Sequence, residues 1–289
     1  MIYLLNIIFF LLSFLIIKNL KIVFKNGSGI LLIILFLELI FFDLNNQKFY
    51  LYIILLSLIY FIDDIYRLPA IVRIFIQIAL GYLIFSQLND NNLFILLLCI
   101  GVSVLLVNTT NFQDGLNLNI GSYIIQFIII IYIYHYSDLV QINSFMLVNL
   151  FIFLILFIPF NVKYNFYFGD SGCFIFTSIV LIFFSMNNFY SNILVFLNIF
   201  LFPFIDTSFV TLLRFQKKEN LLTRNFYHLY HKIYEKKNGY YYLLPPIINN
   251  FVLCTLIVMF DFNMHLKIFL ILIFTLLFYL FTRIFINKL

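Results

Sequence analysis

Charged residues are scarce in this sequence: Asp, Glu, Lys and Arg together make up 10% of its 289 residues. A soluble domain carries about 25% charged and about 45–50% apolar residues, whereas this chain is 64% apolar. A water-soluble globule of this size cannot bury so much apolar surface, and so few polar residues exclude a disordered chain. The composition therefore predicts a polytopic helical membrane protein.

Tryptophan is absent and only three cysteines are present, so Tyr and Phe supply all the aromatic side chains. Cys99, Cys173 and Cys254 lie singly in apolar runs without a CxxC pair. This pattern indicates buried free thiols rather than a metal site or a disulfide framework. The first apolar run, residues 2–17, also lacks a basic segment and a cleavage site, so we expect a retained first helix rather than a signal peptide.

Apolar runs separated by polar breaks predict an all-α protein of about eleven transmembrane helices, forming one domain over residues 1–289. The runs cover residues 2–17, 28–43, 48–62, 71–88, 92–107, 118–135, 144–160, 173–187, 191–206, 243–260 and 267–286. If loops alternate sides, fifteen of the 17 Lys and Arg residues fall on one side, and only Lys48 and Lys267 on the other. The positive-inside rule makes the basic side cytoplasmic, so the N-terminus is expected outside and the C-terminus in the cytoplasm.

The predicted cytoplasmic loops lie near residues 18–28, 63–70, 108–118, 161–172 and 207–242. Five acids fall at these inner helix ends, namely Asp63, Asp64, Asp114, Asp170 and Asp206. A charge within the apolar zone costs about 2.5–3.5 kcal/mol on insertion scales and is retained where a site needs it. Solvation explains any single one of them equally well, but five acids on one side favour a functional site. Glu38, near the outer end of the second helix, is expected to pair with another helix or to snorkel.

Three polar segments stand out against the apolar background. Residues 61–67 contain the pair Asp63 and Asp64, and adjacent carboxylates repel unless a cation lies beside them, which suggests metal or phosphate chemistry. Residues 108–117 place amide and carboxylate groups along the end of a helix. Residues 167–172 form a Gly-Asp-Ser-Gly turn at a helix start, where the acid can face Mg²⁺ while free N–H groups face a phosphate.

The order of these motifs, with Pro203-x-x-Asp206 and a basic segment His228-Leu229-Tyr230-His231-Lys232 after them, resembles the polyprenyl-phosphate N-acetylhexosamine-1-phosphate transferases. The resemblance covers about residues 50–240 and is to the type that initiates O-antigen or teichoic acid rather than peptidoglycan. It implies transfer of a sugar-1-phosphate from a UDP-sugar to undecaprenyl phosphate with release of UMP. It further implies a Mg²⁺-dependent enzyme, with Mn²⁺ as a substitute, whose site faces the cytoplasm from the bacterial inner membrane.

The resemblance also assigns roles to individual residues. The catalytic acids are Asp63, Asp64, Asp114 and Asp170. The metal ligands are Asp170 and, beside it, Asp114. The substrate contacts are Asn108, Asn111, Asn117, Tyr167, Arg67, Arg224, His228, His231 and Lys232. Direct attack by the lipid phosphate and covalent attack by an Asp both stay open.

Three positions depart from the family pattern. Arg67 stands where the family carries Asp or Lys, and Asn117 replaces a second acid at a position that resembles a reader of uracil. The first inner loop, residues 18–28, is short, and the family's pattern there is reduced to Lys-Asn-Gly-Ser-Gly at residues 25–29. These departures leave room for a divergent or inactive member of the family.

A transporter or flippase of lipid-linked sugars is the alternative function, although such sites tend towards the membrane midplane and often accompany internal repeats. Binding of nucleic acid is not expected, because the basic stretch over residues 214–237 is short and interrupted by Glu219 and Glu235. The sequence is compatible with a homodimer and does not fix the oligomeric state. It also does not name the sugar or the glycan pathway.

Overall fold

The structure is a computed structural model that describes residues 2–19, 25–43, 46–88, 92–136, 144–185, 189–220, 226–260 and 262–288. All regular structure in these ranges is helical. The N-terminal helices are α1 (Ile2–Lys18), η1 (Ser28–Leu32), α3 (Ile33–Phe42), α4 (Gln47–Tyr66), α5 (Ala70–Gln87) and α6 (Leu93–Gln113). They are followed by α7 (Asn119–Tyr136), α8 (Ser144–Tyr164), α9 (Gly169–Ser185), α10 (Phe189–Gln216), α11 (Leu229–Lys236), η3 (Tyr240–Leu243), α12 (Leu244–Met259) and α13 (Met264–Lys288).

Eight of the described helices are long and apolar enough to cross a membrane, judged by length and composition: α4, α5, α6, α7, α8, α10, α12 with η3, and α13. Three shorter apolar helices cover residues 2–18, 28–42 and 169–185. A backbone in lipid must satisfy its own hydrogen bonds, which a helix does within one segment. The all-helical, multi-pass class is therefore confirmed, while the number of eleven spans and the orientation stay predictions.

Several helices continue beyond the ends expected from the apolar runs. The helix predicted to end near residue 107 continues to Gln113, and the one predicted to end near residue 206 continues to Gln216. Polar side chains in these last turns bond back to the helix itself, as Thr110 Oγ1 does to the carbonyl of Leu106 at 2.8 Å. Such back-bonding lets a polar residue remain helical, so several motif residues lie on helices rather than loops.

The chain forms two compact units, each described here by itself. Unit 1 comprises residues 1–121 and 143–186, and unit 2 comprises residues 122–142 and 187–289. All three cysteines are buried free thiols, as predicted. Glu38 accepts a hydrogen bond from Asn6 of α1 at 3.1 Å, so it is the helix-paired acid that the sequence suggested.

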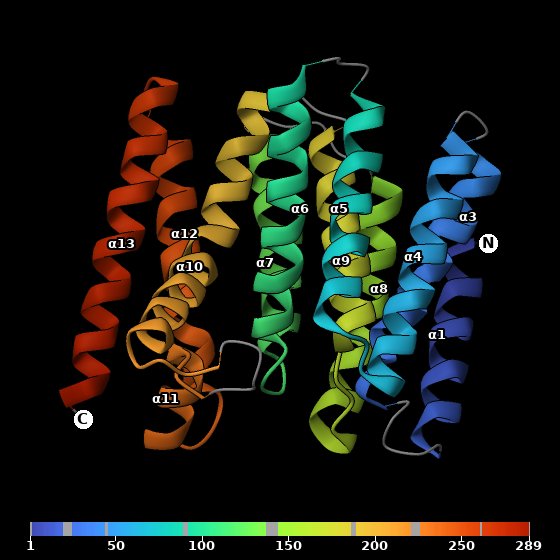
Figure 1. The fold of residues 1–289 in the computed structure, drawn as a ribbon, viewed down its shortest axis with the longest axis horizontal. Coiled ribbons are helices and arrows are strands. Elements are labelled where there is room, and N and C mark those ends of the chain that lie inside the picture. Colours follow the sequence, from blue (N-terminus) through green and yellow to red (C-terminus); the bar gives the residue numbers. More distant parts are fainter. Residues whose placement is uncertain are drawn as a thin grey trace. The chain divides into compact units, whose positions relative to one another are not determined.

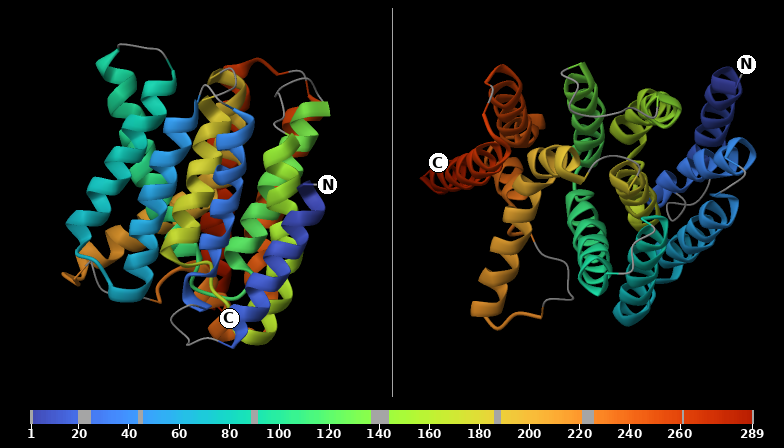
Figure 2. Two further views of the ribbon diagram at one scale, coloured as in Figure 1. Left: turned by 90° about the vertical axis from the view of Figure 1, so that its right-hand side faces the viewer. Right: turned by 90° about the horizontal axis from the view of Figure 1, so that it is seen from above.

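Helix α9 is the buried centre of unit 1 (Figures 1 and 2). Every residue from Ser171 to Phe183 is buried, because α4, α5, α6 and η1 all pack against this helix. Helix α1 lies against α8, where Phe14 contacts the rings of Phe153 and Phe160. The shortness of α9 follows from this position, since a helix enclosed by protein need not match the thickness of the lipid.

Two glycines allow η1 to meet the start of α9 backbone to backbone. A Cβ on Gly29 would lie 2.5 Å from the Cα of Gly172, and one on Gly172 would lie 2.8 Å from the Cα of Gly29. The amides of Ser28 and Gly29 donate to the carbonyls of Tyr167 and Phe168 at 3.2 and 3.0 Å. The shortened first loop is therefore part of the support for the Gly-Asp-Ser-Gly turn.

Unit 2 is built from α10, α12 and α13 with most of α7. Figure 1 shows α13 running alongside α12 and the lower part of α10. Gln126 of α7, Asn198 of α10, and Asn249 and Asn250 of α12 are all buried. Asn250 contacts Gln126 at 2.8 Å, and Asn198 donates to the hydroxyl of Tyr134 at 3.0 Å. These amides form polar contacts between α7, α10 and α12 within the apolar interior of unit 2.

Replacing Gly29 with alanine should destabilise the protein, because the new methyl group overlaps the backbone of α9. Overpacking of this kind costs about 1–3 kcal/mol, which we expect as a lower melting temperature in detergent. Gly101 is the matched control, because a Cβ there meets nothing within 4 Å and alanine gains up to about 1 kcal/mol in a helix. Equal melting temperatures for the two variants would contradict the backbone contact.

Reporter fusions test the predicted orientation. Fusions after residues 66, 116, 168 and 230 should all report the cytoplasm, and fusions near residues 90 and 138 should report the outside, because the basic residues follow this alternation. Opposite sides for any two of the first four fusions would contradict a shared site.

Candidate functional site

The acidic motifs of unit 1 meet at the turn that begins α9. Gly169 adopts a positive φ of 77°, and a Cβ there would lie 2.2 Å from the carbonyl oxygen of Asn26. Only glycine satisfies both the backbone angle and the lack of space. The turn directs the amides of Phe168, Gly169, Asp170 and Ser171 towards α4 and the end of α6.

Asp64, in the last turn of α4, holds the helix start. Its Oδ1 accepts from the amide of Asp170 at 2.7 Å, and its Oδ2 accepts from the amide and hydroxyl of Ser171 at 3.1 and 2.5 Å. A carboxylate at a helix N-terminus satisfies the unpaired N–H groups and the helix dipole together. This side chain therefore fixes the direction in which α9 begins.

Asp114, which follows α6, holds the preceding two amides. Its Oδ2 accepts from Gly169 N at 2.6 Å, and its Oδ1 accepts from Phe168 N at 3.3 Å. Burial raises the pKa of Asp114 to about 8, although both amide donors act in the opposite direction. The sequence-based expectation that free N–H groups of this turn face a phosphate is wrong for residues 168–171, because the neighbouring carboxylates already accept these protons.

Asp63 and Asp170 are positioned differently, around the guanidinium of Arg73. Asp63 Oδ2 lies 3.7 Å from Arg73 Nε, and Asp170 Oδ2 lies 3.8 Å from Arg73 Nη1. The Asp63 side chain is 3% exposed and that of Asp170 is 25% exposed, so Asp170 faces the more accessible side. Asp63 Oδ1 accepts the amide of Leu68, whereas its buried Oδ2 accepts no hydrogen bond.

The three asparagines of the second motif have separate environments. Asn111 contacts the Asp170 carboxylate. Asn108 instead donates to Gln77 Oε1 of α5 at 2.9 Å, and Asn117 donates to Asn165 Oδ1 at 3.2 Å. The structure therefore brings only Asn111 to the acids.

Arg67 and Tyr167 are near the site in sequence, and their expected roles as substrate contacts stay predictions. Arg67 ends α4 with a positive φ of 54° and its side chain is exposed, whereas the ion pairs recorded for Asp63 and Asp170 are with Arg73. The backbone of Tyr167 bonds to Lys25 and Ser28, and its ring is only partly buried. An aromatic ring in this position can still stack on a base.

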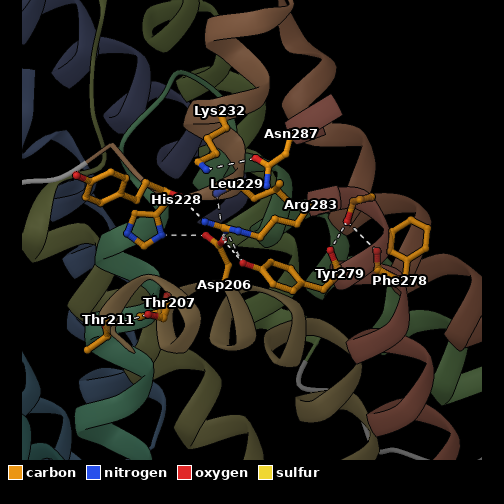
Figure 3. Close-up of polar contacts among 12 residues, drawn as sticks. Asp206, Thr207, Thr211, His228, Leu229, Lys232, Phe278, Tyr279, Arg283 and Asn287 are labelled. Atoms are coloured by element: carbon orange, nitrogen blue, oxygen red, sulfur yellow. Dashed lines mark hydrogen bonds and ion pairs between the residues drawn. The ribbon is translucent and has the colours of Figure 1, made fainter. Parts of the chain in front are cut away.

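Unit 2 contains a second polar cluster, centred on Asp206 of α10 (Figure 3). Asp206 Oδ2 lies 2.9 Å from Nδ1 of His228, and Oδ1 accepts from Leu229 N at 3.0 Å and from the hydroxyl of Tyr279 at 2.9 Å. Arg283 Nη1 lies 3.3 Å from the same Oδ1. His228 is thus a buried, paired side chain and not a solvated loop histidine.

The remaining predicted residues of the basic segment surround this cluster. His231 is buried, and its ring centroid lies 4.3 Å from that of Tyr230. Lys232 approaches Asn287 Oδ1 at 3.5 Å, and burial, assisted by Arg283, lowers the pKa of Lys232. Arg224 lies outside the described residues.

The sequence motifs did not identify four residues as partners of the acids. Arg73, Ser171, Tyr279 and Arg283 contact the acids directly. For Arg283 a signal exists, because an arginine within an apolar run usually has a buried partner. For Arg73 the signal is weaker: it is a cation in the first turn of α5, the helix that follows the Asp pair.

A magnesium site was tested against these donors. Among the described residues, no three His, Cys, Asp or Glu side chains converge to hold a metal. Mg²⁺ commonly uses only one or two carboxylates together with substrate phosphates and water. The buried Asp63 Oδ2 without a hydrogen bond and the adjacent, partly exposed Asp170 fit that requirement. Asp114 fits it less well, because both its oxygens already accept amide protons.

Asp64→Asn should accelerate hydrogen exchange at the amides of Asp170 and Ser171. An asparagine carries one acceptor oxygen where the carboxylate has two, and hydrogen bonds to charged groups are worth about 1.5–3 kcal/mol, so exchange should rise by about tenfold or more. Mass spectrometry of peptides covering residues 166–175 measures this rate.

Asp43→Asn is the control, because Asp43 accepts from Asn46 and Tyr50 in the same unit without contacting α9. It should leave exchange in residues 166–175 unchanged. The same acceleration in both variants would indicate general loosening and contradict a specific cap.

Comparison with known proteins adds no family: no family model, no curated protein and no solved structure matches this chain. The resemblance to the sugar-1-phosphate transferases therefore rests on the residues of the motifs and on their order alone. The contacts around α9 and around Asp206 do not depend on that resemblance.

Proposed function

We propose that the protein transfers a sugar-1-phosphate, of the N-acetylhexosamine class, from a UDP-sugar to a polyprenyl phosphate and releases UMP. The product would be the first lipid-linked intermediate of a surface glycan. One observation carries the proposal: the motif acids of α4, α6 and α9, which lie far apart in sequence, meet at one helix start with Arg73.

The acids divide into two pairs with different tasks. Asp64 and Asp114 accept the amide protons of the turn and fix where α9 starts. The carboxylates of Asp63 and Asp170 do not accept hydrogen bonds from the amides of that turn. They are therefore the better candidates for chemistry. A reacting phosphate needs groups held in fixed positions, which a buried and capped helix start supplies.

Arg73 contributes the positive charge that this site requires. Its guanidinium lies 3.7 Å from the carboxylate of Asp63 and 3.8 Å from that of Asp170, and the Arg73 side chain is about one-third exposed. Guanidinium groups bind phosphate oxygens through paired N–H donors. We infer that Arg73, in place of the exposed Arg67, contacts a substrate phosphate while its charge offsets the repulsion between the two adjacent carboxylates.

Mg²⁺ belongs to the proposal, with Asp63 and Asp170 as the residues that would hold it. The bound ion would neutralise the pyrophosphate and lower the cost of the departing UMP. Asp114 would support the site indirectly, by accepting the hydrogen bond from the amide of Gly169. Asn111, next to Asp170, would orient that carboxylate by a neutral hydrogen bond.

The remaining nucleotide and phosphate contacts, some in unit 1 and some in unit 2, enter the proposal through the family resemblance. His228, His231 and Lys232 would contact phosphate oxygens, with Arg224 beside them in the sequence. Asn117 and Tyr167 would face the uracil base. A bacterial inner membrane with the site on its cytoplasmic side is the location that the resemblance implies.

The transporter alternative has one observation in its favour, namely the amides of Gln126, Asn198, Asn249 and Asn250 within the apolar helices of unit 2. These side chains are at most 2% exposed and carry no charge, and their contacts with each other and with Tyr134 account for them as helix contacts. Paired acids with an arginine are better explained by phosphate chemistry than by transport.

Purified protein with undecaprenyl phosphate and a panel of UDP-sugars, including UDP-GlcNAc and UDP-GalNAc, should release UMP in a Mg²⁺-dependent reaction. Asp170→Asn and Asp63→Asn should each lower turnover by at least about 100-fold, equivalent to about 2.7 kcal/mol of barrier. Added Mg²⁺ or Mn²⁺ should recover part of the loss, since the defect lies in metal affinity.

Asp43→Asn serves as the matched control and should retain full turnover, because its carboxylate contacts only the start of α4. A protein that releases no UMP with any sugar of the panel would favour the transporter. Normal activity of Asp170→Asn at low Mg²⁺ would exclude the site as assigned.

A further inference from the structure

We propose that Asp206 is a positioning residue, which fixes the neutral ring of His228 with its proton on Nδ1. In that tautomer Nε2 is unprotonated and is the ring nitrogen that can accept a proton. The tautomer follows from the contacts of unit 2 alone, whereas its use on a phosphate rests on the proposed function. Figure 3 shows the arrangement.

The charge of Arg283 determines the state of Asp206. Arginine keeps its proton in proteins, and a buried arginine needs an anion as partner. Arg283 and Asp206 are both at least 96% buried, and Nη1 lies 3.3 Å from Oδ1. Asp206 is therefore the anion of this pair.

An ionised carboxylate only accepts hydrogen bonds. Three donors converge on Oδ1 of Asp206: the amide of Leu229, the hydroxyl of Tyr279 and Nη1 of Arg283. The hydroxyl of Tyr279 also accepts from Arg283 at 2.6 Å, so its own proton goes to Asp206. The partner of Oδ2, Nδ1 of His228 at 2.9 Å, must be a donor as well.

The backbone around His228 is held by the same residues. Arg283 Nη2 donates to the carbonyl of Tyr227 at 3.1 Å, and the amide of Leu229 donates to Asp206. The guanidinium also lies 4.0 Å from the ring centroid of Phe209. The residues before and after His228 are thus fixed together with its ring, as a positioned catalytic or binding histidine requires.

If the salt bridge between Asp206 and Arg283 served stability alone, it would not require one particular tautomer of the His228 ring. Here the three donors to Oδ1 of Asp206 do not include His228, because they come from Leu229, Tyr279 and Arg283. The second oxygen is directed at the ring only. Replacement of the carboxylate by an amide reverses this contact, since an amide nitrogen facing Nδ1 donates to it.

The test is the tautomer itself, read from ¹⁵N shifts of histidine in the full-length protein in nanodiscs. The chain has four histidines, and the signals of His228 are assigned by their loss in His228→Gln. Above the pH at which the ring becomes neutral, the proposal expects a protonated Nδ1 and an unprotonated Nε2. A protonated Nε2 in the wild-type protein overturns it.

Two variants separate Asp206 from its neighbours. Asp206→Asn should move the proton to Nε2, because Oδ1 keeps its three donors and the new NH₂ group faces Nδ1. Tyr279→Phe retains the carboxylate and Arg283, and should leave the tautomer unchanged. An unchanged tautomer in Asp206→Asn, or a shift in Tyr279→Phe, overturns the proposal; if Asp206→Asn does not fold, the wild-type and Tyr279→Phe spectra decide it.

Turnover distinguishes this proposal from the proposed function. If UMP is released, Asp206→Asn should lower turnover by about 10²–10⁴-fold, the usual contribution of a positioned acid–base group, with KM changed much less, and Tyr279→Phe should stay within about tenfold. An unchanged turnover in Asp206→Asn would overturn the role of the pair in catalysis. The expected tautomer without any UMP release would exclude the transferase and leave the assignment of Asp206 intact.

Discussion

The capping of α9 by two carboxylates from other helices is the interaction on which unit 1 depends. The first turn of any helix leaves its N–H groups without partners, and the first turn of α9 is only partly exposed at Gly169 and Asp170 and buried from Ser171 onward. Asp64 and Asp114 accept these protons from opposite sides of Gly169. The helix can therefore be both short and largely enclosed.

This cap explains why four acids tolerate one another in an apolar protein. Each carboxylate has a distinct compensation: Asp64 and Asp114 receive backbone and hydroxyl donors, whereas Asp63 and Asp170 lie beside Arg73. Mutual repulsion is thereby offset by fixed dipoles on one side and by a cation on the other.

The sequence predicted the helical membrane class and the set of motif acids, because hydropathy and clustered polar residues are local signals. It did not predict which acid serves which purpose, since that depends on the directions of amides at residues 168–171 and on the closeness of Gly29 to Gly172. Arg67 seemed the natural cation from its position in the motif, yet Arg73, one helical segment later, reaches the carboxylates. Which side chains form ion pairs across helices depends on how the helices pack, and a local sequence pattern does not predict that packing.

The buried pair of Asp206 and Arg283 has a consequence for how the chain is assembled. Translation delivers Asp206 to the membrane 77 residues before Arg283, so the acid is inserted while its permanent cation has not been synthesised. A charged side chain without a partner in the bilayer is costly, and α10 alone would hold it only near the interface. Final docking of α10 against its partners therefore awaits the synthesis of α13, which carries Arg283.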